Sequence, residues 1–163
     1  MTLIYLVIGI VVLGLLIVRN LRARPVRQVN QRLFLILGVI GVIETYQYLG
    51  QHHAGATAVA ALAGSLVLAA AFGLIRAMTV RVWMQDGQPW SQGNALTATL
   101  WILALGAHLG YDGLLDHHKD LSGLGSATVL LYLVVSLIVQ RVVVATRAAR
   151  LAPAPAGGPD WAA

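Results

Sequence analysis

The sequence predicts an all-α membrane protein: a bundle of five transmembrane helices, N-terminus out and C-terminus in, with a short cytoplasmic β-hairpin between helices three and four. Three observations predict it. Apolar residues make up 58% of the 163 positions. Charged residues make up only 10%, whereas soluble domains carry about 25%. Five apolar runs alternate with polar or basic breaks. We expect one membrane domain over residues 1–150 and a disordered cytoplasmic tail over residues 151–163.

The first apolar run covers residues 3–18 and carries no charge. Together with the residues beside it, it reaches the length of about 20 residues that a spanning helix needs. No Lys or Arg precedes it, so we expect a transmembrane helix rather than a signal peptide. A basic loop follows, in which Pro25 ends any continuous helix.

The second predicted helix, residues 33–48, begins apolar and turns polar from Glu44 onward. A turn that contains His52 and His53 follows it. The third predicted helix, residues 54–76, is rich in Ala and Gly, and small residues four apart let neighbouring helices approach closely. These residues are Ala56, Ala60 and Gly64, and then Gly73 and Ala77.

The stretch between the third and fourth helices, residues 73–94, carries a strand pattern. Residues 80–84 are mostly β-branched or aromatic, and Asp86-Gly87 is a favoured two-residue hairpin turn. In that register the facing pairs are Gln85 with Gln88, Met84 with Pro89, and Trp83 with Trp90. Pro89 then removes no ladder bond. We expect Trp83 and Trp90 to meet at the membrane–water interface. The alternative is an irregular loop that happens to contain Asp-Gly.

The fourth predicted helix, residues 95–115, starts after Ser91 or Asn94 as the expected cap. Trp101, His108 and Asp112 recur along it at spacings of seven and four, so they share one face. Glu44, Gln47 and Gln51 share a face of the second helix in the same way. The fifth predicted helix covers residues 127–144.

Basic residues fix the expected orientation. Ten arginines fall on one side of the five-helix arrangement and only Lys119 falls on the other; the arginines are Arg19, Arg22, Arg24, Arg27, Arg32, Arg76, Arg81, Arg141, Arg147 and Arg150. Cytoplasmic loops carry the excess of basic residues, so we expect a multi-pass protein of the bacterial plasma membrane with its C-terminus inside. Because the basic residues flank apolar runs, they mark topology, and we expect no nucleic-acid partner.

Most of the remaining ionisable residues fall on the outer half. Glu44, His108 and Asp112 form a predicted polar cluster within the membrane, in which Glu44 pairs with His108. The favoured interpretation is a buried clamp that fixes helix packing, beside solvated loop histidines. A haem or first-row metal site is the second interpretation, because imidazole is the commonest metal ligand; its ligands would be His52, His53, His108, His117 and His118. A proton or solute path is the third.

The run GLIRAMTVRVWMQDGQPWSQGNALT, together with Leu100-Trp101, resembles the CcdC-like family of small bacterial membrane proteins. That family is named for an operon neighbour in cytochrome c biogenesis and is treated as a domain of unknown function. The resemblance covers about thirty residues and implies a small polytopic membrane protein that assists cytochrome maturation. It implies no catalytic residue.

No catalytic motif accompanies these patterns. The sequence contains no Walker loop, dinucleotide-binding glycine pattern, HExxH or Gly-x-Ser-x-Gly, and it contains no cysteine for thiol chemistry. We therefore favour a non-enzymatic accessory or scaffold subunit, with the lipid bilayer and other membrane proteins or a second copy as partners. The alternatives are a haem- or metal-binding membrane protein and a small oligomeric transporter or channel.

Overall fold

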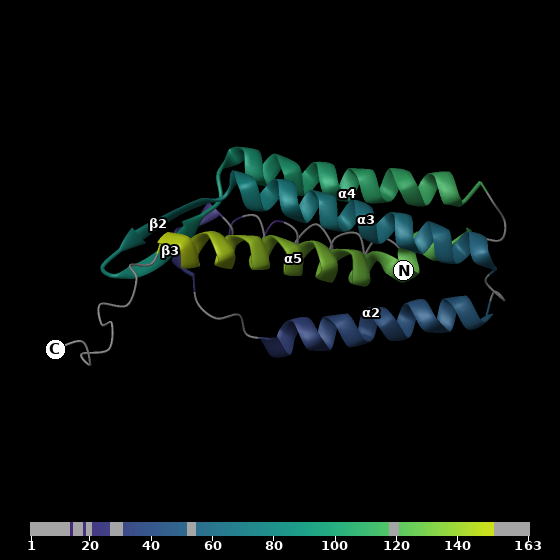
Figure 1. Cartoon of the computed structure of the whole chain (residues 1–163). Helices are drawn as coiled ribbons and strands as arrows, with labels where there is room; N and C mark the ends of the chain where they lie inside the picture. Colours follow the sequence, from purple (N-terminus) through teal and green to yellow (C-terminus); the bar gives the residue numbers. More distant parts are fainter. Residues whose placement is uncertain are drawn as a thin grey trace, which may run out of the picture.

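The computed structural model describes residues 14, 18, 21–26, 31–51, 55–117 and 121–151, with the backbone alone for residues 31–34. The described chain forms four long helices and a small sheet (Figure 1). In chain order the elements are β1 (Arg24–Pro25), α2 (Gln31–Gln51), α3 (Ala56–Thr79), β2 (Arg81–Gln85), β3 (Gln88–Gln92), α4 (Ala95–Leu115) and α5 (Leu124–Leu151).

Three described helices, α3, α4 and α5, are long and apolar enough to cross a membrane. The prediction of a mostly helical chain with apolar helices of membrane-spanning length is therefore confirmed. The segment α2 is confirmed as a helix, while its membrane crossing and the orientation stay predictions. Most of the first predicted helix and residues 152–163 of the predicted tail lie outside the described residues. The predicted bounds of the fourth helix match α4.

Helix α5 is longer than residues 127–144. It continues to Leu151 because Ala, Arg and Leu, which make up most of residues 145–151, are good helix formers even where the apolar run ends. Its extra turns reach the sheet end of the bundle, where Arg147 Nη1 donates to the carbonyl oxygens of Ala77 (2.6 Å) and Val80 (3.0 Å). This basic side chain supplies donors to carbonyls at the C-terminal end of α3, where the helix itself offers none.

Helix α5 is the centre of the arrangement: α3 and α4 lie together on one side of it, and α2 lies on the other (Figure 1). Helices α3 and α5 approach each other closely at Gly73. A Cβ added at Gly73 would lie 2.5 Å from the carbonyl oxygen of Ser136. Gly73 and Ala77 are buried there, as their spacing predicts, whereas Ala56, Ala60 and Gly64 are exposed. The buried small residues of α3 are instead Ala58, Ala61, Ser65 and Ala69.

The predicted hairpin is confirmed residue for residue. Gln85 faces Gln88, Met84 faces Pro89 and Trp83 faces Trp90. Asp86 and Gly87 have φ values of 52° and 71°, the paired positive values that a tight hairpin turn of this kind requires. Strands β2 and β3 pack on the end of α5 (Figure 1), which supplies the support that a lone hairpin lacks.

Strand β1 was not predicted. It pairs with β3, Arg24 opposite Ser91 and Pro25 opposite Trp90, and gives the strand order β1-β3-β2. The amide of Val26 donates to the carbonyl of Pro89 at 2.7 Å. A basic loop with a proline has no strand pattern of its own, so this pairing depends on the free edge that β3 offers.

Gly87→Val is expected to loosen the hairpin without unfolding the helices. No atom lies within 4 Å of a Cβ added at Gly87, so the cost comes from the positive φ alone, about 1–2 kcal/mol for an L-residue with a side chain. Limited proteolysis should cut the variant between β2 and β3 faster than the wild type, while helical circular dichroism is retained. Asp86→Asn, which also tolerates positive φ, should behave as wild type. Equal cutting of wild type and Gly87→Val would contradict the turn assignment.

Candidate functional site

Buried polar side chains run along the interface of α3, α4 and α5. On α5 they recur every four residues and therefore share one face; they are Thr128, Tyr132, Ser136 and Gln140. Helix α4 buries Thr97, Trp101 and His108. The predicted common face of Trp101 and His108 is thus confirmed. A polar group in an apolar interior is costly unless it is hydrogen-bonded. The hydrogen-bond partners of these groups therefore show whether each one stabilises the bundle.

Arg76 lies at the sheet end of this interface with 1% of its surface exposed. Its Nη2 donates to the hydroxyl of Ser136 on α5. Its guanidinium carbon lies 3.8 Å from the ring centroid of Trp101 on α4, a cation–π contact. Arg76 also occupies the last turn of α3, where the helix dipole favours a cation. One side chain therefore ties three helices together; we call Arg76, Trp101 and Ser136 the arginine clamp.

A second set of contacts reinforces the same end. The side chain of Asn94 accepts from the amide of Thr97 at 2.9 Å, and the hydroxyl of Thr97 accepts from the amide of Asn94 at 3.2 Å. This capping box begins α4 and confirms Asn94 as the cap. Thr97 also bonds to the hydroxyl of Thr79 at 2.9 Å. The ends of α3, α4 and α5 beside the sheet are therefore joined by side-chain hydrogen bonds.

His108 lies in the other half of the interface, with 1% of its surface exposed. Its Nε2 is 3.3 Å from the carbonyl oxygen of Gly125. Because a carbonyl only accepts, Nε2 carries the hydrogen and Nδ1 is left as an acceptor in the neutral ring. The ring of Tyr132 lies 4.4 Å away, centroid to centroid, and its hydroxyl donates to the carbonyl of Ala104.

Two acceptors in this region have no donor among the described residues. They are Nδ1 of His108 and Oδ1 of Asp112, and both are buried. Asp112 is one helical turn from His108, and its carboxylate fills the space over Gly125, where a Cβ would overlap it. Both groups therefore meet α5 at Gly125. Buried acceptors in folded proteins are commonly satisfied by ordered water.

The predicted pairing of Glu44 with His108 is wrong. Helix α2 packs against α5, whereas α4 lies beyond α5 (Figure 1). His108 bonds to Gly125 instead, and Glu44 is exposed. Polar residues within two membrane helices do not by themselves fix which way each side chain faces in the bundle.

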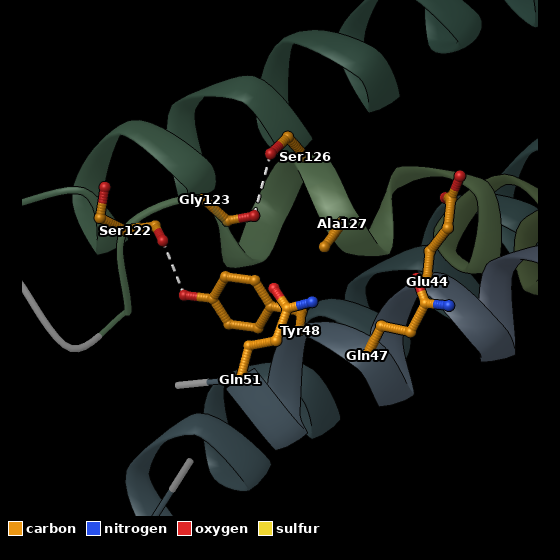
Figure 2. Close-up of a pocket in the computed structure, with 8 residues that line it drawn as sticks. All are labelled: Glu44, Gln47, Tyr48, Gln51, Ser122, Gly123, Ser126 and Ala127. Atoms are coloured by element: carbon orange, nitrogen blue, oxygen red, sulfur yellow. Dashed lines mark hydrogen bonds between the residues drawn. The ribbon is translucent and has the colours of Figure 1, made fainter. Parts of the chain in front are cut away.

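Glu44 lines a polar groove between α2 and the start of α5, with a volume of about 500 Å³ (Figure 2). The lining residues are Glu44, Gln47, Tyr48, Gln51, Ser122, Gly123, Ser126 and Ala127. The predicted common face of Glu44, Gln47 and Gln51 forms its α2 wall. The hydroxyl of Tyr48 donates to the carbonyl of Ser122 at 2.7 Å and joins the two walls. We call this the outer groove.

The proposed metal ligands are not brought together in the described part of the chain. His108 is buried in the helix interface, while His117 is exposed and its Nδ1 bonds to Gly113. His52, His53 and His118 lie outside the described residues. Within the described residues, no three His, Asp or Glu side chains are placed to hold a metal ion. The haem or metal site therefore stays a prediction that these residues do not support.

The arginine clamp is a feature that the sequence analysis missed. Arg76 counts there only as a topology marker, and the four-residue spacing of polar residues on α5 is the signal that would have revealed a buried polar face. No family model, curated protein or solved structure was found to match the chain. The resemblance to the CcdC-like family therefore stays a prediction.

Proposed function

We propose that this protein is a multi-pass membrane protein that serves as a non-enzymatic accessory or scaffold subunit of a membrane complex. Three apolar helices support the membrane location. The observation that carries the scaffold role is the three-stranded sheet at one end of the bundle. It packs on α5, and the arginine clamp and Arg147 join the helix ends beneath it. A sheet that is anchored on the helix ends in this way is suited to protein docking.

The sheet offers a docking edge. Strand β2 is an outer strand of the described sheet, so one side of its backbone has no strand partner there. Such an edge can pair with an extended segment of another protein. The resemblance to CcdC-like proteins leads us to propose that this partner belongs to cytochrome maturation.

We also propose that the sheet faces the cytoplasm, because the arginine-rich segments lie on that side of the predicted topology. Reporter fusions at the two chain ends should then give opposite signals. The same signal from both ends would contradict the proposed orientation.

A photo-crosslinking amino acid at Gln85, an exposed residue of β2, is expected to capture a defined membrane-protein partner in cells. The matched control is Leu103, an exposed apolar residue of α4 that we expect to face lipid. Gly87→Val in the Gln85 background should abolish the product, because it disturbs the strand but not the helices. Mass spectrometry of the product identifies the partner. Identical patterns from Gln85 and Leu103 would overturn the scaffold role.

A second candidate, a small oligomeric proton or cation transporter, is favoured by the two buried acceptors at His108 and Asp112. Proteoliposomes that carry an internal pH dye would then acidify under an applied potential. Asp112→Asn should abolish the flux while keeping the fold, because the amide supplies the missing donor. Wild-type protein without flux at any protein density would exclude this candidate.

A further inference from the structure

The outer groove contains an unpaired charge. Glu44 makes no hydrogen bond or ion pair with any described residue. It is the only charged residue among the eight described residues that line the groove. The other lining groups are amides, hydroxyls, glycine and alanine, so the eight lining residues carry a net negative charge and include no cation.

Glu44 also lies deep along its helix. It precedes Gln51, the last residue of α2, by seven positions, which is about 10 Å at about 1.5 Å per residue. With α2 as a membrane span that ends at the membrane surface, this places the carboxylate near the inner edge of the lipid headgroup layer. Ionisable groups at that depth are costly unless they find a partner. No described residue supplies such a partner, which leaves the carboxylate accessible to a cationic ligand.

The described lining of the groove offers several hydrogen-bond acceptors. The carboxylate of Glu44 and the amide oxygens of Gln47 and Gln51 come from one wall, and the hydroxyl of Ser126 comes from the other (Figure 2). A primary ammonium carries three N–H donors, as the lysine side chain does. A quaternary ammonium carries no N–H donor. The volume of about 500 Å³ is in the range of small-molecule sites, about 300–1,000 Å³.

We propose that the outer groove binds a primary ammonium group through Glu44. Its source is either the headgroup of an aminophospholipid or a free amine, and the two share the recognition chemistry. The groove lies where α2 meets the start of α5, and Tyr48 holds its walls together. The proposal rests on α2 crossing the membrane, and it is independent of any protein partner at the sheet.

The test measures lipid retention by native mass spectrometry of the full chain. The purified protein is released from micelles that contain equal amounts of phosphatidylethanolamine and phosphatidylcholine with identical acyl chains. The wild type should retain the ethanolamine lipid about tenfold more, as expected for one charge-assisted hydrogen bond. In Glu44→Gln, the ratio of retained ethanolamine lipid to retained choline lipid should fall to about one. Glu44 is exposed, so this variant is expected to fold, and thermal unfolding checks it.

Asp86→Asn is the matched control. It also removes one negative charge, but from the hairpin turn at the opposite end of the bundle, and it should keep the tenfold preference. Soluble ethanolamine then separates the two sources: displacement of the lipid assigns a free amine, and retention assigns the lipid headgroup. An unchanged preference in Glu44→Gln would overturn the proposal, and so would a wild type that shows neither lipid preference nor ethanolamine binding. Failure of the Gln85 cross-link would leave this result unaffected.

Discussion

Trp101→Ala is expected to lower the free energy of unfolding by about 3–5 kcal/mol, the usual cost of removing a buried aromatic side chain. Trp101 has 2% of its surface exposed. Its loss opens a cavity among three helices and also removes the ring on which the Arg76 guanidinium lies. Among the described residues, the buried guanidinium would then keep a single hydrogen-bond partner, Ser136. Denaturant-induced unfolding in detergent micelles measures the change.

Two further variants identify the cause. Trp101→Phe keeps an aromatic face for the cation, so its free energy of unfolding should fall clearly less than that of Trp101→Ala. Ile102→Ala removes an apolar side chain from the adjacent position, which is 58% exposed, and should change the stability by less than about 0.5 kcal/mol. If the phenylalanine variant were as unstable as the alanine variant, the cation–π contact would contribute nothing. If Ile102→Ala lowered the stability as much as Trp101→Ala, the arginine clamp would contribute no more to stability than an exposed apolar position.

Local sequence patterns were sufficient for the elements whose geometry is local. Asp86-Gly87 specifies a two-residue turn, and the turn then fixes every facing pair of β2 and β3. The spacing of Trp101 and His108 fixes their shared face, because the helix period is constant. These predictions needed no knowledge of the rest of the chain.

Contacts between distant segments could not be obtained in the same way. The pairing of Arg24 with Ser91 joins two stretches that carry no complementary pattern. The direction in which Glu44 faces depends on how α2 is rotated about its own axis against α5. Hydropathy and depth along the helix leave that rotation free. The burial of Arg76 likewise depends on Trp101 and Ser136 arriving from two other helices.

The last prediction concerns the contact between α3 and α5. Gly73→Ala is expected to destabilise the protein by about 1–3 kcal/mol, the typical cost of overpacking. The new Cβ would lie 2.5 Å from the carbonyl oxygen of Ser136 and 3.1 Å from the side chain of Val139. A backbone carbonyl cannot turn aside as a flexible side chain can, so the two helices must move apart. That movement would also stretch the bond between Arg76 and Ser136.

Gly106→Ala is a control for which we expect the opposite change in stability. Gly106 lies within α4, and no atom lies within 4 Å of its added Cβ. Alanine is the better helix former by about 0.5–1 kcal/mol, so this variant should be slightly more stable than the wild type. The same unfolding assay measures both. Because the two substitutions are chemically identical, opposite signs can come only from the surroundings of each glycine. Stabilisation by Gly73→Ala would mean that α3 and α5 are not in backbone contact at Ser136, and the arginine clamp would then lose its geometric basis.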